Sequence, residues 1–173
     1  MFCSACGREL AHVPPIQCGA CGVEHWRNSK PCSGALVTRN NELLLVKRTI
    51  DPWNGLWDVP GGFCEATELP VATAEREILE ETGYRIQVDE LLGIWLDDYG
   101  EPSPALGQPE ITMCLYYLAH PVDGGDASVD PDEVAEVRWF PADALPERMA
   151  FPNHVYEVLD AWKAKLPLSR EGG

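Results

Sequence analysis

The sequence is poor in basic residues and has no long apolar run. It carries 13 Lys and Arg against 28 Asp and Glu, and only Arg8, Arg27 and Lys30 are fixed cations within the first 30 residues. The formal net charge of −15 is a weak electrostatic footprint for a phosphate backbone, so we expect no nucleic-acid partner. The longest aliphatic runs, such as residues 43–46, are far too short to span a bilayer, so we expect no membrane partner.

The first ten residues lack the basic segment and the apolar core of a secretion signal. Cys32, Cys64 and Cys114 have no evident partner motif, and isolated cysteines of this kind are by default small buried apolar residues. Free thiols are typical of a reducing compartment, which predicts a cytoplasmic protein.

The other four cysteines form two CxxC pairs near the N-terminus, each followed by a glycine. They are Cys3, Cys6, Cys18 and Cys21. Two such pairs predict one tetrahedral zinc site. A pair of disulfides and a redox centre are the alternatives, but no βαβ pattern typical of a thioredoxin-like centre surrounds these cysteines. His12 and His25 are substitute ligands that a shell of four cysteines does not need.

Residues 1–30 are therefore expected to form a zinc ribbon, and residues 31–173 a single domain of ordinary size. Zinc ribbons serve either as binding modules or as structural clips. The scarcity of cations in residues 1–30 favours a clip that stabilises a segment with too small a core of its own.

Strand signals alternate with turns after the cysteine-rich segment. Residues 33–39 and 42–48 flank Asn40-Asn41, a pair that tolerates positive φ, which predicts a β-hairpin. The further expected elements are a short strand at 58–59, strands at 85–88, 91–97, 111–119 and 134–140, and a helix at 153–166.

The last of these elements has the pattern of an amphipathic helix. Asn153 is expected to cap its N-terminus, and Val155, Leu159 and Trp162 form one apolar stripe. This stripe predicts that the helix packs against the sheet.

An acidic helix is expected between two glycine-containing turns, within residues 61–84. Pro70 suits its first turn and Gly83 suits its C-terminal end. Residues three and four apart are neighbours on a helix, so Glu77, Glu80 and Glu81 would repel one another unless a cation, most simply a hard divalent ion, neutralised them. Taken alone, an acidic run of this kind is more often a solvated helix face.

The same segment resembles the signature of the Nudix hydrolase family. The residues at the signature positions are Gly62, Glu68, Arg76, Glu77, Ile78, Glu80, Glu81, Gly83 and Tyr84. Thr67 stands where many members carry glycine, but that position is not a ligand. The resemblance implies an α+β fold, the Nudix α/β/α sandwich with a mixed sheet, preceded here by the small zinc ribbon.

The resemblance also implies roles for the residues of this segment. Magnesium, or manganese, would be held by Glu77, Glu80 and Glu81 together with the carbonyl of Gly61. Structural roles are implied for four further residues, namely Gly62, Glu68, Arg76 and Gly83.

The resemblance also implies a general base in a loop before a late strand. Glu133, in the run Asp-Pro-Asp-Glu at residues 130–133, is the candidate, although such a run is often only a polar turn. Glu80, acting through metal-bound water, is the competing base.

The candidates for substrate binding are Arg48, Trp53 and Tyr99. Arg48 would contact phosphate or else be an exposed arginine at the end of a strand. Trp53 and Tyr99, like Trp57 and Trp95, would stack a nucleobase or else belong to the core, which is the commoner role of aromatic residues in strands. Trp53 is the preferred stacking residue because it lies in the loop just before the glycine turn.

A zinc ribbon before this signature is similar to the architecture of NADH pyrophosphatases. Their SQPWPFPxS segment is missing from the corresponding residues 92–107, whereas residues 53–62, WNGLWDVPGG, look closer to ADP-ribose and FAD pyrophosphatases. We therefore expect magnesium-dependent hydrolysis of a phosphoanhydride in ADP-ribose, FAD or a similar small-molecule dinucleotide. The alternatives are a nucleotide-sanitising or RNA-cap hydrolase and a non-catalytic dinucleotide-binding sensor. Oligomerisation is common in this branch, so a homodimer is expected.

Overall fold

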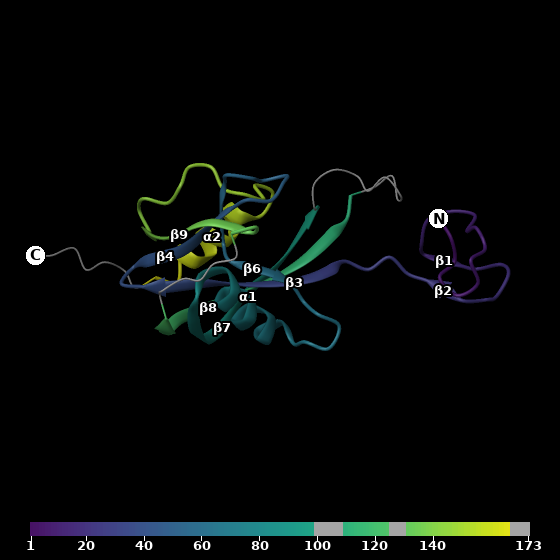
Figure 1. Cartoon of the computed structure of the whole chain (residues 1–173), viewed down its shortest axis with the longest axis horizontal. Coiled ribbons are helices and arrows are strands. Elements are labelled where there is room, and N and C mark those ends of the chain that lie inside the picture. Colours follow the sequence, from purple (N-terminus) through teal and green to yellow (C-terminus); the bar gives the residue numbers. More distant parts are fainter. Residues whose placement is uncertain (99–108, 125–130, 167–173) are drawn as a thin grey trace, which may run out of the picture.

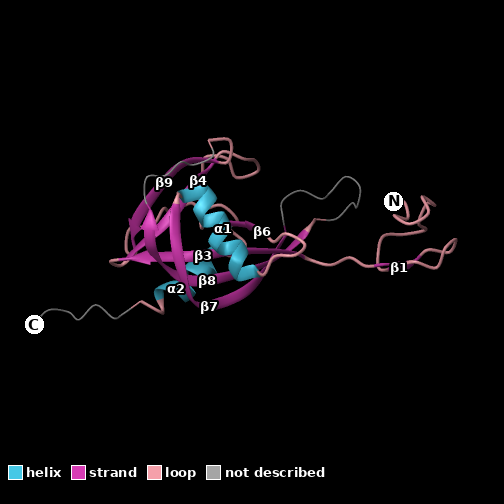
Figure 2. Ribbon diagram, turned by 60° about the horizontal axis from the view of Figure 1, so that its bottom comes forward, coloured by secondary structure: helices cyan, strands magenta, loops and turns pink. Residues whose placement is uncertain are grey.

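The computed structural model describes residues 1–98, 109–124 and 131–166 (Figure 1). In chain order its elements are β1 (Ile16–Gln17), β2 (Glu24–His25), β3 (Lys30–Arg39), β4 (Glu42–Arg48), β5 (Trp57–Asp58), β6 (Gly61–Phe63), α1 (Pro70–Thr82), β7 (Tyr84–Asp98), β8 (Ile111–Gly124), β9 (Val134–Pro141) and α2 (Val155–Lys163). The short strands β1 and β2 pair only with each other, and they lie apart from the remaining elements in both Figure 1 and Figure 2.

The predicted hairpin is confirmed in β3 and β4. Thr38 pairs with Leu43 and Arg39 with Glu42, which leaves a two-residue connection. Asn40 and Asn41, which make this connection, have φ values of 48° and 64°. Positive φ at both central residues is the backbone geometry that matches the twist of a tight hairpin.

The central strand β3 organises a mixed sheet. It pairs in parallel with β8 over eight residues and antiparallel with β6, and β8 in turn pairs antiparallel with β7. Beyond the hairpin turn, β4 leaves β3 and pairs with β5 and β9. The strand order is β5-β4-β3-β8-β7, with β6 attached to β3 and β9 attached to β4.

The two helices cover opposite faces of this sheet (Figure 2). Alternate residues of a strand point to opposite faces, so Leu36 packs in the cluster that contains α2, while Val37 packs in the cluster that contains Ile78 of α1. The expected apolar stripe of the last helix is buried. The expected α+β sandwich with a mixed sheet is therefore confirmed. Among the described residues, no helix is long and apolar enough to cross a membrane.

The expected gap between strands at residues 89–90 is wrong. Strand β7 runs without a break from Tyr84 to Asp98, and its register against β8 shifts between Val88 and Glu90 and again between Leu91 and Gly93. β-Bulges of this kind keep a strand paired while they leave an extra residue out of the ladder.

The expected cap of the last helix is also wrong. Helix α2 begins at Val155, with His154 as its N-cap, and no side chain caps its amides. The Asn153 side chain instead donates to Asp97 Oδ1 at 3.0 Å and to the carboxylate of Asp98. Asn153 therefore ties the start of α2 to the end of β7.

Candidate active site

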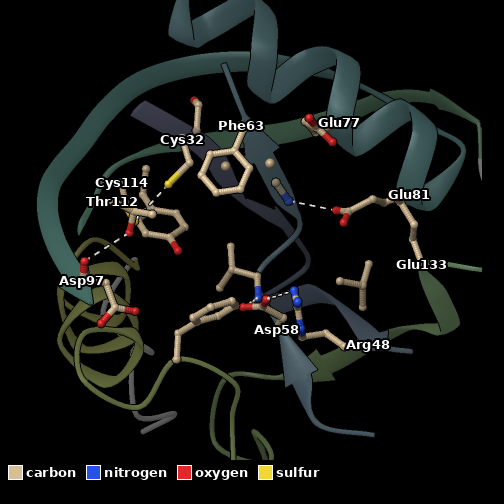
Figure 3. A pocket seen from close by; sticks show the side chains of 18 of the residues that line it. Cys32, Arg48, Asp58, Phe63, Glu77, Glu81, Asp97, Thr112, Cys114 and Glu133 are labelled. Atoms are coloured by element: carbon tan, nitrogen blue, oxygen red, sulfur yellow. Dashed lines mark hydrogen bonds and ion pairs between the residues drawn. The ribbon is translucent and has the colours of Figure 1, made fainter. Parts of the chain in front are cut away.

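A cavity of about 390 Å³ opens between α1, the strands around β3 and the segment before α2 (Figure 3). This volume is in the range of small-molecule sites. The carboxylates in its lining are Asp58, Glu65, Glu77, Glu81, Asp97 and Glu133. The basic residues in its lining are Arg48, Arg76 and His154.

The three glutamates of the signature lie on different sides of helix α1. Glu77 and Glu81 are four residues apart, about 40° around the helix axis, and both line the cavity. Glu80 lies about 60° from Glu77 in the other direction. Its side chain is 58% exposed, against 15% for Glu77. The structure therefore brings Glu77 and Glu81 together in the cavity and leaves Glu80 on the solvent side.

The glycine pair at the start of β6 lies directly against these carboxylates. The amide of Gly61 donates to Glu81 Oε2 at 2.9 Å. A Cβ on Gly62 would lie 2.4 Å from the Glu77 carboxylate. Gly61 thus contacts the acidic helix through its amide, and the role of its carbonyl as a metal ligand stays a prediction. The close approach of Glu77 explains why residue 62 is glycine, whereas a Cβ on residue 61 would lie 2.5 Å from the Ser33 carbonyl oxygen of β3.

Three cavity carboxyls are held where their charged forms are poorly solvated. Burial raises the pKa of Glu81 well above its usual value, and it also raises the pKa of Glu77. Burial raises the pKa of Asp58 to about 6, although Arg48 opposes the shift. A cluster of this kind binds either protons or a cation, and carboxylate oxygens are the ligands that Mg²⁺ and Mn²⁺ prefer. Glu77 and Glu81 therefore fit a hard divalent ion.

Arg76 joins α1 to the loop before it. Its Nε and one terminal nitrogen each donate to Glu68 at 3.0 Å, and its other terminal nitrogen lies 2.8 Å from Glu77 and 3.0 Å from Glu80. The hydrogen bonds from Arg76, then that from Thr73, lower the pKa of Glu68 to about 2. A bidentate pair of this type fixes orientation as well as charge. Arg76 is thus placed to hold Glu77 in its position in the cavity wall.

Arg48 lies in the cavity wall, so its alternative interpretation as an exposed strand-end residue is wrong. One terminal nitrogen lies 3.1 Å from Asp58 Oδ2, and the guanidinium lies over the Phe151 ring at 4.9 Å. Among the described residues, no group forms a hydrogen bond with its buried Nε. A cationic donor without a partner at a cavity wall suits an anionic ligand.

Among the expected stacking residues that the structure describes, none lines the cavity. Trp53 is half-buried and packs edge-on against Phe151 with ring centroids 6.2 Å apart, and Phe151, rather than Trp53, lines the cavity. Trp57 and Trp95 pack against core aromatic rings. Tyr99 lies outside the described residues. No signal in the sequence pointed to Phe151.

The two candidate bases occupy different environments. Glu133 precedes β9 and lines the cavity, where it lies on the same side as Glu81 (Figure 3). The amide of Thr49 donates to the Glu133 carbonyl at 3.1 Å, which ties this residue to the end of β4. Glu80, by contrast, is exposed and paired with Arg76.

The wall opposite Glu81 was missed by sequence reasoning. Asp97 of β7 and Thr112 and Cys114 of β8 lie on this wall (Figure 3), and Tyr116 and His154 also line the cavity. The His154 Nε2 lies 3.0 Å from the Tyr116 hydroxyl, and its Nδ1 lies 3.1 Å from Asp97 Oδ2. The sequence signal for these lining residues was their spacing along β8, because residues two apart on a strand point to the same face of the sheet.

The four N-terminal cysteines converge as expected. Their sulfur atoms all lie within 4.8 Å of one another, with Cys3 and Cys21 at 3.6 Å and Cys6 and Cys18 at 3.8 Å. A tetrahedron with zinc–sulfur bonds of about 2.3 Å has sulfur–sulfur edges of about 3.8 Å, so the arrangement fits zinc. The His25 Nε2 lies 3.2 Å from the Cys3 sulfur, outside this set of four.

The two cysteine pairs share one backbone geometry. The amide of Gly7 donates to the Cys3 carbonyl at 2.9 Å, and the amide of Gly22 donates to the Cys18 carbonyl at 2.8 Å. Both glycines have positive φ. The backbone amides of Ala20, then of Cys21, lower the pKa of Cys18 to about 6, which favours the thiolate that metals require.

The comparisons with known sequences agree with the resemblance. Residues 29–161 match the NUDIX domain. The NAD-capped RNA hydrolase NudC of Stutzerimonas stutzeri is 30% identical over 173 residues, covering 96% of this chain and 58% of that protein. A MutT-like protein of Streptomyces ambofaciens is 32% identical over 134 residues, covering 78% of this chain and 77% of that protein. The chain thus spans little more than half the length of the NudC relative.

Solved structures show the same fold. A NUDIX hydrolase from Nitrosomonas europaea superposes with a TM-score of 0.69 at 28% identity, covering 96% of this chain and 94% of that one. A MutT NUDIX hydrolase from Burkholderia pseudomallei superposes with a TM-score of 0.64 at 29% identity, covering 78% and 98%. The NUDIX match, the similar relatives and the packing of the acidic helix against the glycine turn all support one conclusion. The chain belongs to the Nudix hydrolase family.

Proposed function

We propose that this protein hydrolyses a phosphoanhydride bond in a nucleoside diphosphate linked to a second moiety, with Mg²⁺ or Mn²⁺ as cofactor. The observation that carries the proposal is the meeting of Glu77, Glu81 and the Gly61 amide in one cavity. The chain has a net charge of −15, so an anionic substrate would be repelled from these carboxylates unless a cation lay between them.

The roles of the residues follow from their places in the cavity. Glu77 and Glu81 would hold the divalent ion, with Glu80 as a further ligand if it leaves Arg76. When bound, such an ion polarises a phosphoryl group and lowers the pKa of its water. Glu68 and Arg76 would keep Glu77 in position through the ion pairs described above. Arg48 would bind a phosphate oxygen through its guanidinium, because the residue lines the cavity.

We assign the general base to Glu133 in preference to Glu80. Its carboxylate would accept a proton from the attacking water as the water oxygen bonds to phosphorus and the bridging phosphorus–oxygen bond breaks. The lining of the cavity includes Glu133, whereas Glu80 is exposed and paired with Arg76.

ADP-ribose, FAD or a similar dinucleotide is the proposed substrate class. A cavity of about 390 Å³ with Phe63, Tyr116 and Phe151 in its lining suits an organic group beside a diphosphate. A second candidate is the NAD cap of RNA, which is favoured by the name of the relative from Stutzerimonas stutzeri and runs against the expectation of no nucleic-acid partner. The excess of 28 acidic over 13 basic residues favours the small dinucleotide.

For the N-terminal segment, we propose that residues 1–30 form a zinc ribbon with a structural role and that residues 31–173 form the hydrolase domain. The core of this segment consists of Cys3, Leu10 and Cys18, with Ile16 packed against them. Such a core is too small to fold without a metal or another constraint.

A substrate panel tests the proposal. Purified protein with Mg²⁺ would be given ADP-ribose, FAD, NADH, diadenosine polyphosphates, nucleoside triphosphates and NAD-capped RNA, and the products would be separated by chromatography. Glu81→Gln should lose at least about a hundredfold in turnover, because one charged ligand of the ion is lost. Glu75→Gln, on the exposed side of the same helix, is the matched control and should stay active. Unchanged turnover in Glu81→Gln would refute the metal site, and tight binding of a dinucleotide without any product would favour a non-catalytic sensor.

A further inference from the structure

Two cysteines without a role in the proposed hydrolysis face each other in the cavity. Cys32 of β3 and Cys114 of β8 are direct partners in the parallel register, and both line the cavity. Their sulfur atoms lie 3.0 Å apart on the wall opposite Glu81 (Figure 3). The sequence alone predicts small buried apolar residues at both positions.

The surroundings of this pair make its two sulfurs unequal. The Cys32 thiol donates to the Cys114 sulfur, and this hydrogen bond lowers the pKa of Cys114 to about 5 while it raises the pKa of Cys32. Burial opposes the shift at Cys114, and contacts with His154 and Thr112 reinforce it. A thiolate beside a protonated thiol is the arrangement of a nucleophile and its resolving partner.

The basicity of His154 adds to this asymmetry. Burial by itself would lower the pKa of His154, but its hydrogen bond with Cys114 and the charges of Cys114 and Asp97 raise the pKa overall. A cationic imidazole at this place stabilises a thiolate at Cys114.

A metal site is not the better explanation of the pair. Within the part of the chain that the structure describes, the one group of three or more candidate ligands at metal-binding separations is the N-terminal set of four cysteines. Adjacent strands place paired Cα atoms about 4.8 Å apart. This separation lies within the range of about 4.4–6.8 Å that a disulfide spans.

We propose that Cys32 and Cys114 are a thiol-oxidation site, which hydrogen peroxide converts reversibly into a disulfide across β3 and β8. The Cys114 sulfur attacks one peroxide oxygen, the oxygen–oxygen bond breaks, and the other oxygen leaves as water after it takes a proton. The Cys32 sulfur then attacks the resulting Cys114 sulfenic acid, and the sulfur–oxygen bond breaks with loss of a second water. The two sulfurs together give two electrons to the peroxide, and a thiol reductant reverses the change.

The bond would alter the cavity without touching the acidic helix. It removes the thiolate charge and fixes two side chains on the wall opposite Glu81. If the proposed function is correct, the oxidised protein should therefore change in KM more than in kcat. This kinetic consequence rests on the proposed function, whereas formation of the bond does not.

Peptide mapping tests the bond directly. Full-length zinc-loaded protein is reduced, desalted and treated with hydrogen peroxide, and its remaining thiols are then alkylated. Trypsin places Cys32, Cys64 and Cys114 on separate peptides, because Lys and Arg residues bound the segments 28–39, 49–76 and 86–138. The expected product is the first segment linked to the third, with a mass two hydrogens below their sum, released by dithiothreitol.

Matched variants separate this bond from general oxidation. Cys64 is the control, because its charge acts on Cys32 and it is the competing partner. Cys64→Ser should still form the linked peptide, whereas Cys32→Ser and Cys114→Ser should lose it. A link from Cys32 to Cys64, or oxidation confined to the N-terminal cysteines, would overturn the proposal. The linked peptide can be detected in the unmodified protein, so the test does not depend on any variant. The disulfide is expected to form even if the protein hydrolyses no substrate. A failure of the proposed function can therefore be told apart from a failure of the proposed disulfide.

Discussion

The two adjacent glycines before the acidic helix should respond differently to the same substitution. In Gly61→Ala the new Cβ would lie 2.5 Å from the Gly34 Cα and 2.5 Å from the Ser33 carbonyl oxygen. These are backbone atoms of β3, which cannot move away without breaking the pairing of β3 with β6. Gly61 also has a φ of 155°, a backbone conformation that residues other than glycine rarely adopt.

In Gly62→Ala the obstacle is the end of a flexible side chain. The new Cβ would lie 2.4 Å from the Glu77 carboxylate, with no backbone atom among its three nearest neighbours. Glu77 can rotate away from the added methyl group at little cost to the fold, but it would then leave the cavity. Gly62→Ala should therefore remove activity while the protein stays folded.

The magnitudes follow from the two kinds of obstacle. Overpacking costs about 1–3 kcal/mol and a strained backbone about another 1–3 kcal/mol, so Gly61→Ala should lose about 2–6 kcal/mol of a total stability of about 5–15 kcal/mol. Gly62→Ala should lose about 1 kcal/mol or less in stability and at least about a hundredfold in kcat/KM.

Urea unfolding at pH 7 measures the first quantity for both variants, and hydrolysis of the preferred panel substrate measures the second. Gly55→Ala is the control for replacing a glycine of positive φ where no atom lies within 4 Å of the new Cβ. The reasoning is refuted if Gly62→Ala keeps normal turnover, or if Gly61→Ala is as stable as the unmodified protein.

Three further predictions concern protonation, the base and the cysteine cluster. Burial raises the pKa of Asp58 from 3.8 to about 6, so its contribution to stability is present below about pH 4 and is lost as the pH rises through 6, a change of about 3 kcal/mol. Urea unfolding of metal-free protein from pH 4 to pH 7 should show this fall, and the same slope in Asp58→Asn would contradict it. Glu133→Gln should reduce kcat by about a hundredfold in steady-state assays, and Glu80→Gln should reduce kcat less. The opposite order would assign the base to Glu80. Metal analysis should find one zinc ion per chain, and Cys18→Ser should lose that ion and expose residues 1–30 to proteolysis. A folded zinc-free segment would exclude a structural role.

Local sequence signals were sufficient where a short segment decides its own conformation. Asn40 and Asn41 tolerate positive φ, and Pro70 and Gly83 bound the acidic helix at the residues observed. Signals that depend on a distant partner failed. Asn153 has the chemistry of a helix cap, but its amide binds carboxylates of β7 that the sequence places more than fifty residues away.

The N-terminal cysteines show how far spacing alone reaches. Their two CxxC pairs predicted a cluster of four sulfurs, and the structure brings the four sulfurs within 4.8 Å. Each pair is closed by a local turn at its own glycine, so the arrangement within each pair is determined by a few neighbouring residues. Cys32 and Cys114 have no such spacing, because strands 82 positions apart in the chain bring them together.

The sequence by itself determined the family, the acidic helix and the glutamates on it, since a periodic signature and its turns are local properties of the chain. Only the tertiary structure decided which glutamates enter the cavity, because the direction of a helical side chain has meaning only once the helix is docked on the sheet. It also decided that Arg48 lies beside Asp58 and that Cys32, Cys114 and His154 line the same cavity. These residues come from strands and loops far apart in the chain, and the pairing of β3 with β8 and the packing of α2 bring them to one cavity.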